Sequence, residues 1–491
     1  MVILGLDVGT TGCKCAAFTD GGAELCTAYS EYTNIPGNPN LKPRTLRNSV
    51  FGVVRDCVAM LEDSTQVAAI AISSFGESVV ALDGRGEPLG DIVMYYVDSA
   101  NDDFFRIVGE IGAERIMQIT RVKPDTMYSL AKMLPQIKEH GDKIWKFLEI
   151  EDYIAFCLCR ETVTDYSLAT RTLLFDLENL RWSDELLKAS GIGLDTLSTP
   201  VPSGSAVGAI TPEAARELGL GGGVKIVICA QDQITNALGS GVLNENEAVD
   251  GNGTVECVTP LFKTLPPIGF TRRNYVSVPY LDKGYATYAF NFTGGSLLQW
   301  YKSAFGQNLR VPEEPFYDYM NRMCPSAPTG MLVLPHFQGA GGTPDMIKDA
   351  KGVIWGLDLG SDAFSVYRAL MEGLSFEMKI NLETIAGYGI KPTRIFASGG
   401  GARSAKWLQI KADVWNCEVI PVLTSEAGAQ GAAIMAAAAL NGETAEAASG
   451  RFVKHGAPVA PNPEFAGVYA GYYERYKALR EYSFSQCRDL R

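Results

Sequence analysis

Two segments far apart in the chain share one pattern, in which a turn rich in glycine and threonine separates two strand-like runs. The first begins at Val2 and reads VILGLDVGTTGCKCAAF, and the second begins at Glu247 and reads EAVDGNGTVECVTP. Apolar and β-branched residues on both sides of a glycine turn predict a β-hairpin. Because 491 residues are too many for one hydrophobic core, the recurring hairpin predicts two lobes of related architecture, over residues 1–243 and 244–491.

Each hairpin is followed by segments that alternate between strand and helix patterns. After the first come a strand (ELCTAYSEY), an amphipathic helix over about 46–63 and an apolar strand over 67–75, and residues 100–220 are rich in helix patterns. After the second come a helix over about 361–386, the strand RIFAS, the helix KWLQIKADVW, the strand CEVIPV, the alanine-rich helix AGAQGAAIMAAAAL and a terminal helix. Strand–helix–strand units predict an α/β fold.

The charge of the chain argues against nucleic acid as a partner, and its hydropathy argues against a membrane. The formal net charge is −13 and there is no run of Lys and Arg, so a phosphate backbone would be repelled. The N-terminus lacks the charged start of a signal peptide. The most apolar stretch, residues 427–440, is shorter than the roughly 18–20 residues that span a bilayer. Its many alanines predict a closely packed helix instead.

Cysteine and histidine are not spaced as in a disulfide framework or a zinc site. The eleven cysteines are scattered, and Cys13 and Cys15 lie two positions apart on a predicted strand. That spacing favours packing on one face of the strand over metal binding. The three histidines are far apart, which makes a zinc site improbable. Reduced thiols favour a cytoplasmic location.

Four segments carry side chains suited to phosphoryl chemistry, and each also has an ordinary structural explanation. In the first hairpin, Asp7 could hold Mg²⁺ through water, and the turn that follows offers hydroxyl and backbone N–H donors to a phosphate. The structural alternative is a plain tight turn. For the second hairpin, at 250–254, the alternative is an Asn-Gly turn with no ligand.

The other two segments follow apolar strands. Residues 398–404 (SGGGARS) could admit a flat ligand against the backbone, with Ser404 bonding a base or ribose. They do not fit G-x-G-x-x-G, and no P-loop motif occurs in the chain. Asp232 follows the strand VKIVICA, where open α/β sheets place their active sites. It could equally be the N-cap of the next helix, and the residues alone leave both readings open.

In this order and spacing, the four segments resemble the FGGY carbohydrate kinase family of the actin-like ATPase superfamily. The resemblance covers almost the whole chain and includes GLDVGTTG, ISSFGESVVALDGRGEPL, TVTDYSLATRTLLFDL, AQDQ, YRALMEGLSFEM and FASGGGARSAKWLQIKADVW. It implies two actin-like (ribonuclease H-like) lobes, each a mixed β-sheet flanked by helices, with a cleft between a sugar-binding N-terminal lobe and a nucleotide-binding C-terminal lobe. It also implies ATP and Mg²⁺ as cofactors and makes a homodimer an expectation.

The resemblance assigns roles to individual residues. Asp232 matches the general base, and Asp7 matches the carboxylate near Mg²⁺ and the transferred phosphate. The nucleotide would be held by Thr10, Thr11, Lys14, Gly253, Thr254, Gly400, Gly401 and Ser404. A base placed on the acceptor hydroxyl typically contributes about 10²–10⁴-fold to the rate.

On the substrate side the chain departs from well-known members. Glu77 lines up with a glutamate of glycerol kinases, but the arginine before it is Gly76 here. A Trp-x-Asp-x-Arg stretch is replaced by YYVDS at 95–99, which makes Asp98 a second candidate for binding substrate. For both acids the alternative is a solvated loop. Three aromatic residues could pack against a sugar or belong to the core: Phe75, Tyr95 and Tyr96.

The sequence therefore predicts an ATP-dependent kinase of a small ketose or polyol, without identifying the sugar. A degenerate kinase, or an actin-fold protein that uses ATP only as a switch, is the alternative. Loss of Asp7 or Asp232 would have favoured a degenerate kinase, and both residues are present.

Overall fold

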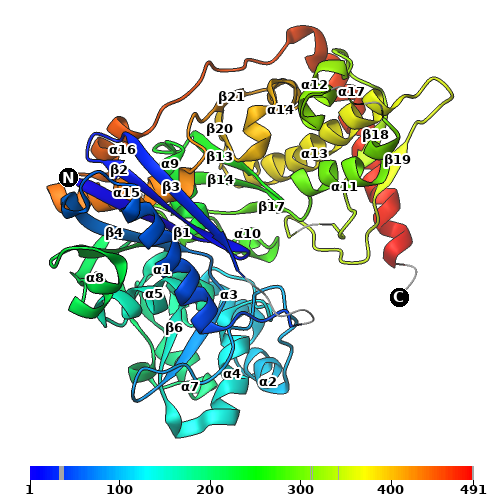
Figure 1. Ribbon diagram of the computed structural model, residues 1–491. Coiled ribbons are helices and arrows are strands. Elements are labelled where there is room, and N and C mark those ends of the chain that lie inside the picture. The colour runs from blue at the N-terminus through cyan, green and yellow to red at the C-terminus, as the bar shows by residue number, and fades with distance from the viewer. Residues whose placement is uncertain (33–37, 283, 310, 312, 341, 489–491) are drawn as a thin grey trace.

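Two mixed β-sheets with helices packed on them form the two halves of the molecule (Figure 1). The computed structural model describes residues 1–32, 38–282, 284–309, 311, 313–340 and 342–488. Within these ranges, no helix is both long enough and apolar enough to cross a bilayer.

The first sheet contains the predicted N-terminal hairpin. β1 (Val2–Val8) pairs antiparallel with β2 (Gly12–Thr19) and parallel with β4 (Val67–Ser74), and β4 runs parallel to β12 (Lys225–Gln231). The outer strands β3 (Glu24–Glu31) and β11 (Ser205–Ala209) are antiparallel to their neighbours. The spatial order is β11-β12-β4-β1-β2-β3. Cys13 and Cys15 are fully buried on β2, which confirms their predicted packing role.

Helices and short strand pairs make up the rest of this half. The helix predicted at 46–63 forms at α1 (Pro43–Ala59), and a proline in its first turn suits a helix start. The other helices are α2 (Asp102–Ile111), α3 (Ala113–Thr120), α4 (Ser129–His140), α5 (Ile150–Cys159), α6 (Tyr166–Ala169), α7 (Asp184–Ser190), α8 (Pro212–Leu218) and α9 (Asp232–Gly239). The strand pairs are β5 (Val79–Asp83) with β6 (Ile144–Glu149), β7 (Val163–Asp165) with β10 (Thr199–Val201), and β8 (Phe175–Asp176) with β9 (Arg181–Trp182).

The second sheet repeats the central arrangement of the first. β13 (Glu247–Asn252) pairs antiparallel with β14 (Glu256–Phe262) and parallel with β20 (Arg394–Ser398), which runs parallel to β21 (Glu418–Pro421). The spatial order is β15 (Val278–Pro279), β16 (Tyr285–Ala286), β14, β13, β20 and β21, and β17 (Ala289–Asn291) also pairs with β14. In each half, the first strand of a hairpin is followed on its other side by parallel strands. This confirms the predicted two lobes of related α/β architecture.

The second sheet is also flanked by helices. The long helix predicted at 361–386 forms at α13 (Ala363–Ala386), and the predicted terminal helix forms at α17 (Pro463–Arg488). The other elements are α10 (Gly269–Arg272), α11 (Gly295–Phe305), α12 (Phe316–Met323), α14 (Ala405–Trp415), α15 (Ala427–Asn441), α16 (Ala445–Phe452) and the strand pair β18 (Leu332–Leu334) with β19 (Val353–Trp355).

The alanine-rich helix α15 returns from the C-terminal third of the chain to the first sheet. In Figure 1 the orange α15 and α16 lie beside the blue N-terminal strands, and α15 contacts both β1 and α9. A Cβ atom at Gly431 would lie 1.9 Å from the Thr235 carbonyl oxygen, and one at Gly5 would lie 2.1 Å from the Ala429 carbonyl oxygen. Glycine at both positions lets backbones touch directly, as the alanine-rich sequence predicted. Since α9 also contacts β13 and β14, these helices join the two sheets.

Candidate active site

Two of the predicted catalytic residues flank the end of one strand. In the first sheet, Asp7 on β1 pairs with Ser73 on β4, and Gln231 at the end of β12 pairs with Ser74. Asp232 follows Gln231 directly. Because β1, β4 and β12 are parallel, their carboxyl ends lie at one edge of the sheet, the edge at which open α/β sheets bind ligands.

Asp232 is the first residue of α9 and not its N-cap. The cap is Gln231, whose side-chain oxygen accepts from the Gln233 backbone N–H at 3.1 Å. The structural alternative for Asp232 is therefore wrong. Its Oδ1 atom is buried without a hydrogen-bond partner. Burial, together with the nearby Asp7 and Glu77 carboxylates, raises the pKa of Asp232 to about 8.

Asp7 lies beside a pocket of about 580 Å³ at the first hairpin. The pocket is lined by Asp7, Gly9, Thr11, Gly12, Lys14 and Tyr29. Lys14 forms an ion pair with Glu426 at 3.0 Å, just before α15 begins. Burial raises the pKa of Asp7 to about 6, against the opposing effect of Lys14 and with a further contribution from Glu426. The positive end of the α15 dipole lies at this pocket, because a Cβ atom at Gly428 in the first turn would lie 2.7 Å from Asp7 Oδ2. Tyr29 and Glu426 were not predicted.

The second hairpin lies directly against the glycine loop at 399–401. A Cβ atom at Gly399 would lie 2.6 Å from the Asn252 backbone oxygen, and one at Gly401 would lie 2.7 Å from Asn252 Cγ. Gly253, Thr254 and Gly400 are exposed, while Asn252 is buried. The structure thus brings together two segments that were predicted to bind the nucleotide, 250–254 and 398–404, although they are far apart in the chain.

Ser404 has a structural role in addition to its predicted one. It is the N-cap of α14: its Oγ accepts from the Trp407 backbone N–H at 3.2 Å and lies 3.1 Å from Asn321 Oδ1. A contact with adenosine, as the resemblance implies, stays a prediction for this residue.

Helix α9 runs from Asp232, at the edge of the first sheet, toward the second hairpin. Its Asn236 accepts from Ser398 Oγ at 3.1 Å, and the Asn236 amide lies 3.1 Å from where a Cβ of Gly251 would stand. The short helix that begins at Asp232 therefore also contacts both segments predicted to bind nucleotide.

Glu77 is paired with an arginine that the sequence analysis did not single out. Arg171 Nε donates to Glu77 Oε1, and both residues are 5% exposed. Gly76 lies close against this arginine, and a Cβ atom there would lie 3.1 Å from Arg171 Cγ and crowd it. Glu77 has φ of 65°, a conformation uncommon outside glycine and frequent at functional sites.

The Arg171 guanidinium lies between two tyrosine rings. Its central carbon is 5.0 Å from the Tyr128 ring centroid and 5.4 Å from that of Tyr288. Burial would lower the pKa of Arg171, but Glu77 and the two tyrosines outweigh it and raise the pKa. Its Nη1 atom is buried without a partner. The one signal for this residue in the sequence was a lone arginine in the apolar run SLATRTLLF.

The other substrate candidates are placed differently. Asp98 is exposed, and its Oδ1 accepts from the Ala100 backbone N–H at 3.0 Å, as in an ordinary turn. Its role in binding substrate stays a prediction. Phe75 is buried in the core, as its structural alternative proposed, and Tyr96 is 57% exposed. Tyr95 is close enough to Glu77 and Asp232 to feel their charges. Burial, and then these two carboxylates, raise the pKa of Tyr95 to about 12.

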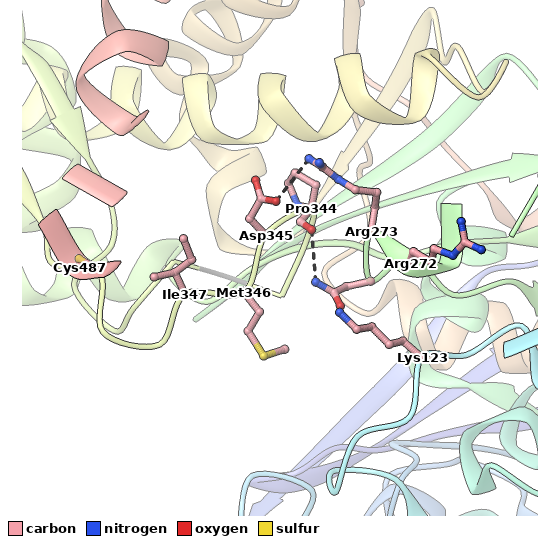
Figure 2. Close-up of a pocket in the computed structure, with 9 residues that line it drawn as sticks. Lys123, Arg272, Arg273, Pro344, Asp345, Met346, Ile347 and Cys487 are labelled. Carbon is pink, nitrogen blue, oxygen red and sulfur yellow. Dashed lines mark hydrogen bonds and ion pairs between the residues drawn. The ribbon is translucent and has the colours of Figure 1, made fainter. Parts of the chain in front are cut away.

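A second pocket, of about 320 Å³, lies where the loop after α3 meets α10 and the segment 344–347 (Figure 2). Arg273 pairs with Asp345 at 3.4 Å, and Arg272 pairs with Glu114 through two contacts of 3.0 and 2.5 Å. None of the predicted site residues lines this pocket. It is therefore separate from the active site that the sequence motifs predict.

Family models match both halves of the chain. The N-terminal domain model of the FGGY family of carbohydrate kinases matches residues 2–239, and the C-terminal domain model matches residues 269–440. The chain belongs to the FGGY family of carbohydrate kinases. This confirms the family that the motifs predicted and the prediction that the protein is a carbohydrate kinase.

Known members of the FGGY family align with this kinase over most or all of its length. A xylulose kinase of Staphylococcus epidermidis is 27% identical over 503 residues, covering 100% of this chain and 98% of the relative. A gluconokinase of Bacillus subtilis is 25% identical, covering 88% and 86%. The crystal structure of a ligand-bound xylulose kinase from Lactobacillus acidophilus has a TM-score of 0.89 at 22% identity, covering 100% of both chains. This last match confirms the fold.

Proposed function

We propose that this FGGY kinase transfers the γ-phosphoryl group of ATP to a hydroxyl of a small ketose or polyol, with Asp232 as the general base. One observation carries the proposal. The Asp232 carboxyl group stands at the edge of the first sheet where open α/β sheets bind ligands, with one oxygen lacking a partner and with a pKa raised to about 8 by burial and by Asp7 and Glu77. A base works best when its pKa lies near the operating pH, and a carboxyl group with a free buried oxygen can accept a hydroxyl proton.

The nucleotide would bind across the two hairpins and the glycine loop. Thr10, Thr11 and Lys14 would face the phosphates from the first hairpin, and Gly253 and Thr254 from the second. Gly400, Gly401 and Ser404 would hold the adenosine. In support, Thr11 and Lys14 line the pocket of about 580 Å³. The second hairpin contacts the glycine loop through Asn252, which lies against Gly401. Positioned donors supply most of the catalysis in phosphoryl transfer.

Asp7 suits a Mg²⁺ ion held through water. Its pKa of about 6, raised by burial, means that its charge is poorly compensated without a cation. In the described parts of the chain, no group of three or more His, Cys, Asp or Glu side chains could hold a metal. That fits Mg²⁺, which keeps several waters and takes phosphate oxygens as ligands. When bound, the ion would bridge the phosphates and neutralise their charge.

The sugar would lie against Glu77 and Gly76 in the N-terminal half, with residues 1–243 as the sugar-binding lobe and 244–491 as the nucleotide-binding lobe. Glu77 accepts hydrogen bonds only, and the unpartnered Arg171 Nη1 can only donate. Together they suit a hydroxyl that donates to one and accepts from the other. Their opposite charges cancel, which favours an uncharged acceptor. Relatives named for xylulose and for gluconate are both similar to this chain, so identity alone does not select the sugar.

Two further proposals concern the location and the oligomeric state of the protein. The first is a cytoplasmic location, which is supported by the eleven cysteines, all of them free thiols as expected in a reducing compartment. A homodimer is expected from the resemblance to the family, and light scattering after size-exclusion chromatography would test it.

The test is ATP consumption by the purified protein against a panel of ketoses, polyols and sugar acids, together with the variants Asp232→Ala and, as a matched control, Asp142→Ala at an exposed position. One strong acceptor is expected, with turnover lost by about 10²–10⁴-fold in Asp232→Ala and unchanged in Asp142→Ala. Binding of MgADP should survive both changes. Turnover similar to wild type in Asp232→Ala would reject the base, and a silent panel with intact MgADP binding would favour an ATP-binding switch.

A further inference from the structure

A buried ion triad lies behind the second hairpin and is not used by the proposed chemistry. Lys411 Nζ on α14 contacts Asp250 Oδ2 on β13 and lies 2.8 Å from Glu256 Oε1 on β14. Lys411 is 2% exposed, and both acids are completely buried. Burying three charges costs free energy, because each must be taken out of water, and only their attraction to one another offsets that cost.

The triad joins the hairpin to the helix that begins after the glycine loop. Asp250 precedes the hairpin turn and Glu256 follows it, so the two carboxylates hold the turn from both sides. Lys411 belongs to α14, which begins one residue after Ser404. Between them, Asn252 donates to Glu256 Oε1 at 3.3 Å and packs against Gly399 and Gly401.

The ammonium group is the only positive member of the triad. Burial alone would lower the pKa of Lys411, but the two carboxylates outweigh it and raise the pKa, which keeps the side chain charged. Its Nζ also lies over two rings of α14, 4.7 Å from the Trp407 ring centroid and 5.2 Å from that of Trp415. These rings fix the side chain on the α14 side, so the charge can draw the hairpin toward the helix.

We propose that Lys411 is a positioning residue for the nucleotide: it sets the place of the hairpin at 253–254 relative to the glycine loop at 400–404. The inference rests on the proposed function, in which these segments hold ATP. Because the sugar would bind near Glu77 in the other half, the effect of Lys411 falls on nucleotide binding and leaves sugar binding unaltered. A residue that only stabilised the fold would weaken both together.

The experiment compares Lys411→Met, Lys411→Arg and, as a matched control on the same helix, Lys406→Met. Methionine keeps an unbranched apolar side chain of similar length and removes the charge. We measure the Kd for MgADP by calorimetry and, with the acceptor found in the panel, the KM for each substrate. In Lys411→Met, the Kd for MgADP and the KM for ATP should rise by about tenfold or more, with the KM for the acceptor within about twofold of wild type. Lys411→Arg should lie between, and Lys406→Met should match wild type.

The outcomes separate the two proposals. Wild-type protein that does not bind MgADP would reject the nucleotide site itself. Wild type that binds, with Lys411→Met binding equally well or with both KM values rising in parallel, would overturn the positioning role alone. If Lys411→Met does not fold, Asp250→Asn takes its place, because it keeps the shape of the side chain and removes the charged partner. The same split between the two KM values is then expected, and an unchanged KM for ATP would overturn the inference.

Discussion

Removing Arg171 tests whether the buried pair with Glu77 holds this part of the structure. Both residues are 5% exposed. Breaking a buried ion pair by deleting one partner typically costs about 3–5 kcal/mol, because the other charge is left without compensation. Arg171→Met should lose this amount, and the two tyrosine rings should lose their cation contacts with it. At about 2 °C per kcal/mol for a lobe of this size, the melting temperature should fall by roughly 6–10 °C.

The double variant Arg171→Met with Glu77→Gln shows whether the loss of stability comes from the uncompensated charge of Glu77. Replacing both members of a buried pair leaves no uncompensated charge, so its cost should be well below the sum of the two single changes. Arg47→Met is the matched control. Arg47 also forms a two-contact pair, with Glu217, at 2.6 Å for each contact, but it lies at the surface. An exposed pair contributes about 0–1 kcal/mol.

The assay is thermal unfolding followed by circular dichroism, at one protein concentration and without ligand. Additive losses in the double variant, or a loss in Arg171→Met no larger than in Arg47→Met, would refute the assignment of a buried, mutually dependent pair.

Two further predictions follow from the pKa of Asp232 and from the packing of α15. The pKa of Asp232 is about 8 in the fold against an ordinary 3.8, so its contribution to the stability of the fold is complete below about pH 4 and is lost as the pH rises through about 8. Asp232→Asn, which cannot ionise, should therefore melt above wild type at pH 9, with the gap closing toward pH 4; a gap independent of pH would contradict the raised pKa. Gly431→Ala places a methyl group 1.9 Å from the Thr235 carbonyl oxygen and should cost about 1–3 kcal/mol. Gly450→Ala on α16, with open space around it, should cost nothing, and equal melting temperatures for the two variants would show that α15 does not pack as described.

Much of the fold could be predicted from the sequence because its signals are local. The hairpin at 2–19 and its repeat at 247–262 depend on glycine turns between apolar runs, and both formed within a residue or two of the prediction. The same holds for Asp232, since a carboxylate directly after an apolar strand must lie at the end of that strand. The N-cap alternative failed because a neighbouring side chain, Gln231, took the capping bond.

The sequence by itself determined the family, the two related lobes and the position of Asp7 and Asp232 at strand ends. Only the tertiary structure decided that Arg171 meets Glu77, that Lys411 joins α14 to the second hairpin, and that α15 lies on the first sheet. Each of these contacts joins residues separated by many others in the chain. Periodicity and turn chemistry report on residues that are near one another in the chain. These partners are distant in the chain and are brought together by close packing of the interior and by the need to pair buried charges.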